Sequence, residues 1–156
     1  GVMNRSLACS GRHVLEIAEQ LCHGRGVRLT PQRRCVLEIL CDSSKPMGAY
    51  EILEQMQVQV GSAKPPTVYR ALEFLLVQGL AHRIESLNAY VSCVHPEHPH
   101  ASQFLICRDC GEVRELESRS VDRTLESALK ACGFQADAQM IEVTGRCLRC
   151  SGGRSA

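Results

Sequence analysis

Two pairs of cysteines in the sequence have the spacing of metal ligands. Cys107 and Cys110 form one C-x-x-C unit, and Cys147 and Cys150 form another, with about three dozen residues between the two units. Each unit can direct two thiolates at one ion, so the two units can supply the four sulfur ligands of a closed tetrahedral zinc site. Gly111 follows the first unit, where a tight turn favours a residue without a side chain. The spacing predicts a structural zinc ion that joins two distant parts of the chain.

The alternative interpretation of these cysteines is thiol redox chemistry. A thioredoxin-type motif usually consists of one C-x-x-C unit between a strand and a helix, and it needs no second unit. The beginning of the sequence lacks the apolar run of a secretory signal, so we expect a reducing compartment, where thiols bind metals more often than they form disulfides. Zinc is the favoured interpretation, and the expected localisation is cytoplasmic.

A second set of metal-binding side chains surrounds the middle of the chain. It combines imidazole, thiolate and carboxylate groups: His82, Cys93, His95, His98, His100 and Glu115. A thiolate with imidazoles suits zinc, whereas a ferrous site is usually richer in oxygen and nitrogen ligands. Ionised Cys93 and Glu115 would together carry about −2, which one Zn²⁺ would neutralise. Each residue alone is more often an ordinary surface or core residue, so only the combination predicts a second zinc site, at a hinge.

The elements that would position the four cysteines follow from the pattern after about residue 95. Short strands are predicted over residues 103–106, 113–117 and 140–144. A helix between the last two is indicated by apolar residues at helical spacing, namely Val121, Leu125, Ala128, Leu129 and Cys132, and Gly133 suits the position after its end. A unit of about 60 residues has a thin core, so we expect a metal ion or a partner subunit to stabilise it.

The N-terminal half has the pattern of four helices followed by two short extended runs. The helices are predicted over residues 14–22, 31 to about 42, from about 49, and 65–79, and the extended runs over residues 81–84 and 89–93. Thr30 and Pro31 are typical of a helix start. This order of elements is that of a winged helix, a helix-turn-helix variant whose fourth helix would enter the major groove of DNA by its N-terminal end.

The start of the fourth predicted helix has side chains that can contact DNA. Arg70 could reach guanine edges, and Thr67 could reach a phosphate or a thymine methyl group. Six arginines lie within residues 1–35, although the whole chain has a formal charge of only +1. An ordinary surface position for Tyr69 and Arg70 is the alternative, because exposed arginines are common.

Other functional classes fit the sequence less well. No apolar stretch approaches the roughly 18–20 residues that a membrane span needs. His95, Pro96 and Glu97 before Cys107 are similar to the zinc deaminase signature, H-x-E…P-C-x-x-C. However, Ile106 stands where that signature has proline, the gap is short, and the second C-x-x-C unit would have no role. We therefore expect no enzyme, no membrane partner and no small-molecule substrate.

Three tracts resemble the ferric uptake regulator superfamily. They are residues 28–33 (RLTPQR), 49–53 (AYEIL) and 64–72 (KPPTVYRAL), and both C-x-x-C units agree with the resemblance. It extends from about residue 14 to 150, and residues 63–93 are its most specific stretch. Within the superfamily the chain is most similar to the zinc uptake regulators of Gram-negative bacteria. The dense His-His-x-His run of the iron-sensing branch is absent, which argues against iron or peroxide sensing.

The resemblance implies a homodimeric repressor that senses zinc. Loaded with zinc, it would bind palindromic, AT-rich operator DNA and silence zinc-import genes. The implied fold is α+β, with a winged helix-turn-helix DNA-binding domain over residues 1–94, a hinge at about 92–101 and a small, zinc-stapled α/β dimerisation domain over residues 102–156. About two zinc ions per chain are implied, one structural and one regulatory.

The resemblance also assigns roles to individual residues. The structural zinc ligands would be Cys107, Cys110, Cys147 and Cys150, and the regulatory ligands would be His82, Cys93, His100 and Glu115. His100 is preferred to His95 and His98 because it directly precedes the Ala101-Ser102 that leads into the first cysteine pair. Tyr50 and Arg70 would approach bases, whereas Arg28, Lys64, Thr67 and Tyr69 would mostly contact phosphates.

Some features leave alternatives open. A sister regulator that senses iron, manganese, nickel or peroxide is the alternative function, and a thiol redox sensor fits less well. Five cysteines find no place in either site, namely Cys9, Cys22, Cys35, Cys41 and Cys132. Cys22 and Cys132 lie on predicted apolar stripes, so we expect both to be buried.

Overall fold

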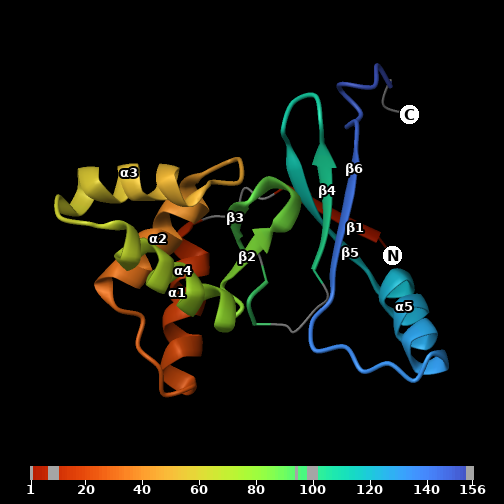
Figure 1. Ribbon diagram of the computed structural model, residues 1–156, viewed down its shortest axis with the longest axis horizontal. Helices are drawn as coiled ribbons and strands as arrows, with labels where there is room; N and C mark the ends of the chain where they lie inside the picture. The colour runs from red at the N-terminus through yellow and green to blue at the C-terminus, as the bar shows by residue number, and fades with distance from the viewer. Residues whose placement is uncertain (1, 7–10, 94, 98–101, 154–156) are drawn as a thin grey trace. The chain divides into compact units, whose positions relative to one another are not determined.

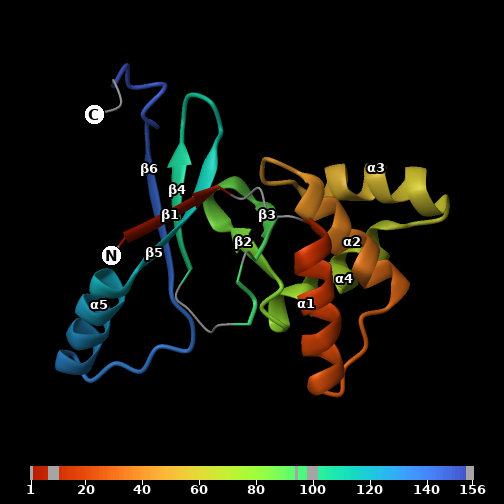
Figure 2. The same ribbon diagram turned by 180° about the vertical axis from the view of Figure 1, so that it is seen from behind.

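The computed structural model describes residues 2–6, 11–93, 95–97 and 102–153 (Figure 1; Figure 2). The chain divides into two compact units, which we call the helical unit and the sheet unit. The helical unit spans Leu7–Pro99, and the sheet unit combines Gly1–Ser6 with His100–Ala156. Among the described residues, no helix has the length and apolar character needed to cross a membrane.

The helical unit has the predicted order of helices followed by a hairpin (Figure 1). Its described elements are α1 (Gly11–Gly24), α2 (Pro31–Asp42), α3 (Ala49–Val60), α4 (Pro65–Val77), β2 (Ala81–Ile84), the short 3₁₀ helix η1 (Glu85–Leu87) and β3 (Ala89–Ser92). The winged-helix prediction is therefore confirmed, with helix ends that shift by a few residues.

The helix boundaries have local causes. The Thr30 hydroxyl accepts a hydrogen bond from the backbone N–H of Arg33 (3.4 Å), which satisfies one of the free amides at the start of α2. Pro31 fills the first helical position, where its missing N–H costs no hydrogen bond. α3 ends at Val60, and Gly61 after it has a φ of 70°, in the left-handed region that favours glycine.

The core of the helical unit forms around α2, which packs against α1, α3 and α4. Leu37 of α2, Ile52 of α3 and Leu72 of α4 are all fully buried. Each such side chain stabilises the fold by about 1.5–3 kcal/mol relative to an exposed one. The cation of Arg33 also lies 3.8 Å from the ring centre of Phe74, a second link between α2 and α4.

The hairpin is joined to the helices by backbone hydrogen bonds. β2 and β3 pair antiparallel, with Ala81 opposite Ser92 and Ile84 opposite Ala89. Met47, in the segment before α3, exchanges two backbone hydrogen bonds with Tyr90 of β3, at 3.0 and 2.8 Å. The hairpin is thus fixed to the start of α3 and is the wing of the fold.

The sheet unit contains a mixed sheet and one helix. Its described elements are β1 (Val2–Ser6), β4 (Ser102–Cys107), β5 (Val113–Ser118), α5 (Arg119–Ala131) and β6 (Met140–Gly145), and the strand order is β1-β5-β4-β6. The three strands predicted from the sequence are confirmed, whereas β1 was not predicted. β5 pairs antiparallel with β1 and β4, and β4 pairs parallel with β6.

Helix α5 corrects one prediction from the sequence. Ser118 caps its start, since its hydroxyl accepts a hydrogen bond from the Val121 N–H (3.5 Å). The helix is strongly amphipathic, yet it has no buried residue. Cys132, expected to be buried, is exposed, because the described chain covers the apolar side of this helix only in part. The same expectation for Cys22, on α1, is confirmed.

Candidate metal centre and candidate nucleic-acid interface

The parallel pairing of β4 and β6 brings the two C-x-x-C units together. Cys107, the last residue of β4, pairs with Gly145 at the end of β6, so both strands end at the same edge of the sheet. The first pair spans the end of β4 and the turn after it, and the second pair lies in the turn after β6. The Gly111 N–H donates to the Cys107 carbonyl (2.9 Å) in the first turn, and the Ser151 N–H donates to the Cys147 carbonyl (2.9 Å) in the second.

The four cysteines have the geometry of a tetrahedral zinc site. Their sulfur atoms all lie within 4.8 Å of one another, and the Sγ atoms of Cys110 and Cys147 are 3.8 Å apart. Zinc–sulfur bonds of about 2.3 Å in a regular tetrahedron place the sulfurs about 3.8 Å apart. These four residues therefore fit a zinc ion held entirely by thiolates.

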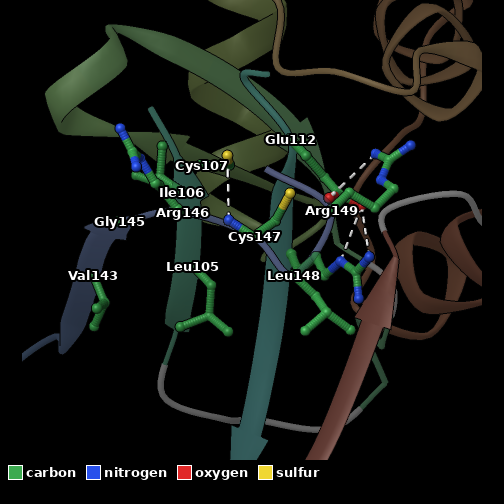
Figure 3. Close-up of a pocket in the computed structure, with 11 residues that line it drawn as sticks. Leu105, Ile106, Cys107, Glu112, Val143, Gly145, Arg146, Cys147, Leu148 and Arg149 are labelled. Atoms are coloured by element: carbon green, nitrogen blue, oxygen red, sulfur yellow. Dashed lines mark hydrogen bonds and ion pairs between the residues drawn. The ribbon is translucent and has the colours of Figure 1, made fainter. Parts of the chain in front are cut away.

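Hydrogen bonds shift the pKa values of two of the four thiols in opposite directions. Backbone N–H groups, first that of Cys110 and then that of Cys147, lower the pKa of Cys107 to about 6. The Cys147 N–H lies 3.3 Å from the Cys107 sulfur (Figure 3). Hydrogen bonding to Cys147, followed by burial, raises the pKa of Cys150 to about 12. Zinc binding requires the cysteines to lose their thiol protons, so acid weakens zinc binding.

Charged side chains beside the cysteines were not singled out from the sequence. Asp109 and Glu112 lie in or after the first pair, and Arg146 and Arg149 lie before and within the second. A cavity of about 430 Å³ at the cluster is lined partly by Glu112 and these two arginines (Figure 3). Arg114 donates a hydrogen bond to Glu112 (2.9 Å) and lowers the pKa of that carboxyl. Their positions next to metal-binding cysteines were the signal available in the sequence.

The second predicted metal site is divided between the two units. His82 lies in β2, half-buried, and Cys93 follows β3 with only 1% of its surface exposed. The Cys93 N–H donates to the Leu80 carbonyl (2.9 Å), and His82 pairs with Val91, two residues before Cys93, so both residues lie at the same end of the wing. Glu115 belongs to β5 of the sheet unit and is 1% exposed.

The histidine cluster of this predicted site is only partly described. His98 and His100 lie outside the described residues, and the preference for His100 remains a prediction. His95 is described, and its Nδ1 lies 3.4 Å from a carboxylate oxygen of Glu97. Glu115 is buried, and a carboxylate is one of the ligand types that zinc accepts.

The residues predicted to contact DNA are on the surface of the helical unit. Tyr50 lies in the first turn of α3 and is 78% exposed, and Tyr69 lies in the first turns of α4 and is 53% exposed. Both line one small apolar depression with residues of α3 and α4, so the beginnings of these two helices are adjacent. Lys64, Arg70 and Arg28 are also exposed, and Thr67 is half-buried.

This surface can attract a polyanion. α4 begins with two prolines, which have no N–H, and the Thr67 N–H donates to the Lys64 carbonyl (3.0 Å), so positive potential at this end comes from the helix dipole and from side chains. Lys64 and Arg70 add full positive charges around the start of α4. The aromatic faces of two exposed tyrosines beside these cations suit contacts with bases rather than burial in a core.

Residues 24–144 match the ferric uptake regulator family. The chain belongs to this family. The zinc uptake regulation protein of Escherichia coli strain K12 is 40% identical over 140 residues, which cover 89% of this chain and 82% of that protein. The peroxide operon regulator of Bacillus subtilis strain 168 is 28% identical over 89% of this chain and 94% of its own length.

Solved structures of family members show the same similarity. A zinc uptake regulator complexed with zinc and DNA superposes with a TM-score of 0.86 at 39% identity, covering 92% of this chain and 97% of that one. Holo XcZur superposes with a TM-score of 0.82 at 44% identity, covering 92% of this chain and 99% of its own. The resemblance inferred from the sequence, including the zinc uptake regulator branch of the family, is confirmed.

Proposed function

We propose that the chain is a zinc-responsive transcriptional repressor of zinc uptake, which binds palindromic operator DNA as a dimer when it is loaded with zinc. The observation that carries this proposal is the likeness, over 92% of the chain, to a zinc uptake regulator complexed with zinc and DNA. In such a role the protein acts on DNA in the cytoplasm, without catalytic residues, a membrane partner or a small-molecule substrate.

Two zinc ions per chain would have different tasks. The first ion, held by the four cysteines, is structural, because a closed four-thiolate site leaves no position for exchange. The second is regulatory and is held by His82, Cys93, His100 and Glu115. A set of ligands drawn from both units can convert zinc occupancy into a restriction of their relative orientation.

An uncovered apolar surface of the sheet unit supports dimerisation. Large apolar side chains are exposed on α5, on β6 and in the segments that follow each of them: Val121, Phe134, Met140, Val143 and Leu148. A monomer rarely leaves such a group of residues open to water. A second copy of the chain, packed against the same surface, would bury them and supplement the thin core of this unit.

The beginning of α4 would read the operator. In this proposal Arg70 and Tyr50 approach base edges, and Arg28, Lys64, Thr67 and Tyr69 mostly contact the phosphates. The two recognition helices of a dimer reach successive major grooves only in a narrow range of orientations. The fraction of dimers in that range multiplies the apparent affinity, so regulatory zinc raises affinity by raising this fraction.

Operator binding at buffered zinc concentrations tests the proposal. Fluorescence anisotropy with a palindromic, AT-rich duplex should show tight binding only above a threshold of free zinc. Cys93→Ser should remove this zinc response and leave a folded dimer, whereas Cys132→Ser, outside both sites, should retain it. Equal affinity of the wild-type protein with and without regulatory zinc would refute the proposal.

The same assay separates zinc from other metals. Parallel titrations with Fe²⁺, Mn²⁺ and Ni²⁺, each buffered over its own concentration range, should produce no comparable gain in affinity. A larger gain with one of these ions than with zinc would instead identify a sister regulator of the family. Metal analysis before and after mild chelation should show about two zinc ions per chain falling to about one.

A further inference from the structure

Two ion pairs connect the turns that hold the four cysteines. We call residues 107–112 the first knuckle and residues 146–150 the second knuckle. Arg146 Nε lies 2.9 Å from a carboxylate oxygen of Asp109, and a terminal nitrogen of Arg149 lies 3.6 Å from one of Glu112. Figure 3 shows the guanidinium of Arg149 facing the carboxylate of Glu112. Each pair joins a carboxylate of the first knuckle to an arginine of the second.

The two ion pairs lie beyond the point at which the pairing of β4 with β6 ends. The pairing of β4 with β6 ends at Cys107 and Gly145, and one further backbone hydrogen bond, from Arg108 N–H to the Gly145 carbonyl (2.9 Å), follows it. Beyond this point the knuckles must be kept together by the metal and by side chains. Arg114, paired with Glu112 at 2.9 Å, fixes the carboxylate that Arg149 approaches.

The charges of the knuckles match the charge of the metal site. A zinc ion with four thiolates carries a net charge of about −2. The side chains in and beside the knuckles comprise four arginines (Arg108, Arg114, Arg146, Arg149) and two carboxylates (Asp109, Glu112), a sum of +2. The arginines are therefore placed to offset the charge of the complex, and the two carboxylates direct two of them across the gap between the knuckles.

We propose that the Asp109–Arg146 and Glu112–Arg149 pairs are positioning contacts that hold the two knuckles in place and slow the release of zinc from the four cysteines. This inference rests on the structural zinc site of the proposed function. The residues do not touch the metal, so they act through the positions of the cysteines. Both pairs are partly exposed, which limits each of them to a modest effect that salt can screen.

The experiment measures zinc release from the full chain to an excess of a chromogenic chelator. The regulatory ion should leave in a fast phase and the structural ion in a slow phase, and the rate of the slow phase is the readout. Asp109→Asn and Arg146→Gln should each accelerate the slow phase by about two- to fivefold. The double variant should release zinc no faster than the single variants, because both lack the same contact.

A variant with the two charges exchanged distinguishes an effect of the contact between the two side chains from an effect of their net charge. The variant Asp109→Arg with Arg146→Asp keeps the net charge and can form the pair in the opposite direction, so it should return the slow phase to within about twofold of wild type. Glu19→Gln is the matched control, since it breaks the Arg34–Glu19 pair (2.7 Å) in the helical unit and should leave the rate unchanged.

Two further measurements make the result decisive. Wild-type release should accelerate with added salt more than release from the single variants, because only wild type has this pair to screen. Cobalt-loaded variants should keep the absorption bands of a tetrahedral four-thiolate site, which shows that the ligands are intact. Wild-type rates in both single variants, or additive effects without rescue by the exchange, would overturn the inference. A wild-type protein without any slowly released zinc would instead refute the structural zinc site itself.

Discussion

The helical unit surrounds its central helix, whereas the sheet unit covers its only described helix in part. Residues of α2 such as Val36 and Leu37 are completely buried among α1, α3 and α4. In contrast, α5 has an apolar side but no buried residue, and Val143 of β6 is 53% exposed. The helical unit can thus be stable through its own core, whereas the sheet unit needs contributions from outside it, namely a metal ion and a second copy of the chain.

Loss of the structural metal should have the largest effect, and it should affect the units unequally. Cys107→Ser removes one of four thiolates, and a structural zinc site contributes about 10–16 kcal/mol to folding. This contribution is as large as or larger than the whole free energy of unfolding of a small domain. The sheet unit should therefore unfold, and dimerisation should be lost. Hydrogen exchange followed by mass spectrometry should show lost protection in β4, β5 and β6 with retained protection in α2. Protection in β6 equal to that of wild type would show that the fold of the sheet unit does not depend on the metal.

A cavity in the helical core should produce the opposite pattern. Leu72→Ala removes a side chain that is 1% exposed and should destabilise the helical unit by about 2–5 kcal/mol. Zinc bound by the four cysteines and the dimer should both remain. Urea unfolding and size-exclusion chromatography check these two results, with Leu87→Ala, an exposed position in η1, as the control. Dissociation of the dimer by Leu72→Ala would show that the units are not independent.

A charge on the uncovered surface should dissociate the dimer without unfolding either unit. Val143→Asp places a carboxylate where we expect a second copy to pack, and a buried, unpaired charge should weaken dimerisation at least about tenfold. Analytical ultracentrifugation over a range of protein concentrations measures the change. Val58→Asp introduces the same charge on α3, at a position that is 88% exposed, and should have no effect. A similar loss of dimer in both variants would place the interface elsewhere.

The smallest expected effect concerns the start of α2. Thr30→Ala removes the acceptor for the Arg33 N–H and should lower the stability of the helical unit by about 0.5–2 kcal/mol. Thr30→Ser keeps an oxygen at the same place and should behave nearly as wild type. Thermal unfolding of zinc-loaded protein provides the comparison. An unchanged midpoint in Thr30→Ala would indicate that the cap contributes nothing beyond the core packing of α2.

The elements that depend on local pattern were predictable from the sequence. Thr30 and Pro31 determine the start of α2 through contacts within one turn, and the alternating residues of 113–117 correspond to β5 (Val113–Ser118). The spacing of the cysteines was equally informative, because zinc imposes the same geometry in any fold. The four sulfur atoms do converge as that spacing requires.

Features that depend on distant partners could not be predicted in the same way. The strand Val2–Ser6 is a strand because it pairs with β5, more than 100 residues away, and nothing in its own residues reveals that partner. The exposure of Cys132 has a similar origin, since an apolar stripe shows that a helix prefers a cover but not whether the same chain provides one. The ion pairs between the knuckles also depend on the β4–β6 register, which no local pattern reports.

The parallel pairing of β4 with β6 has a consequence for synthesis of the protein on the ribosome. Cys107 and Cys110 emerge before the strand beside them and before the other two ligands, which follow only after α5 and the segment behind it have been made. A contact between residues so far apart in sequence closes a long loop, which is entropically costly and slow. A nascent chain therefore carries half of its structural site as open thiols for seconds, and zinc capture can be completed only when the second knuckle arrives. Binding of zinc by all four cysteines would therefore occur only after every strand of the sheet unit has been synthesised.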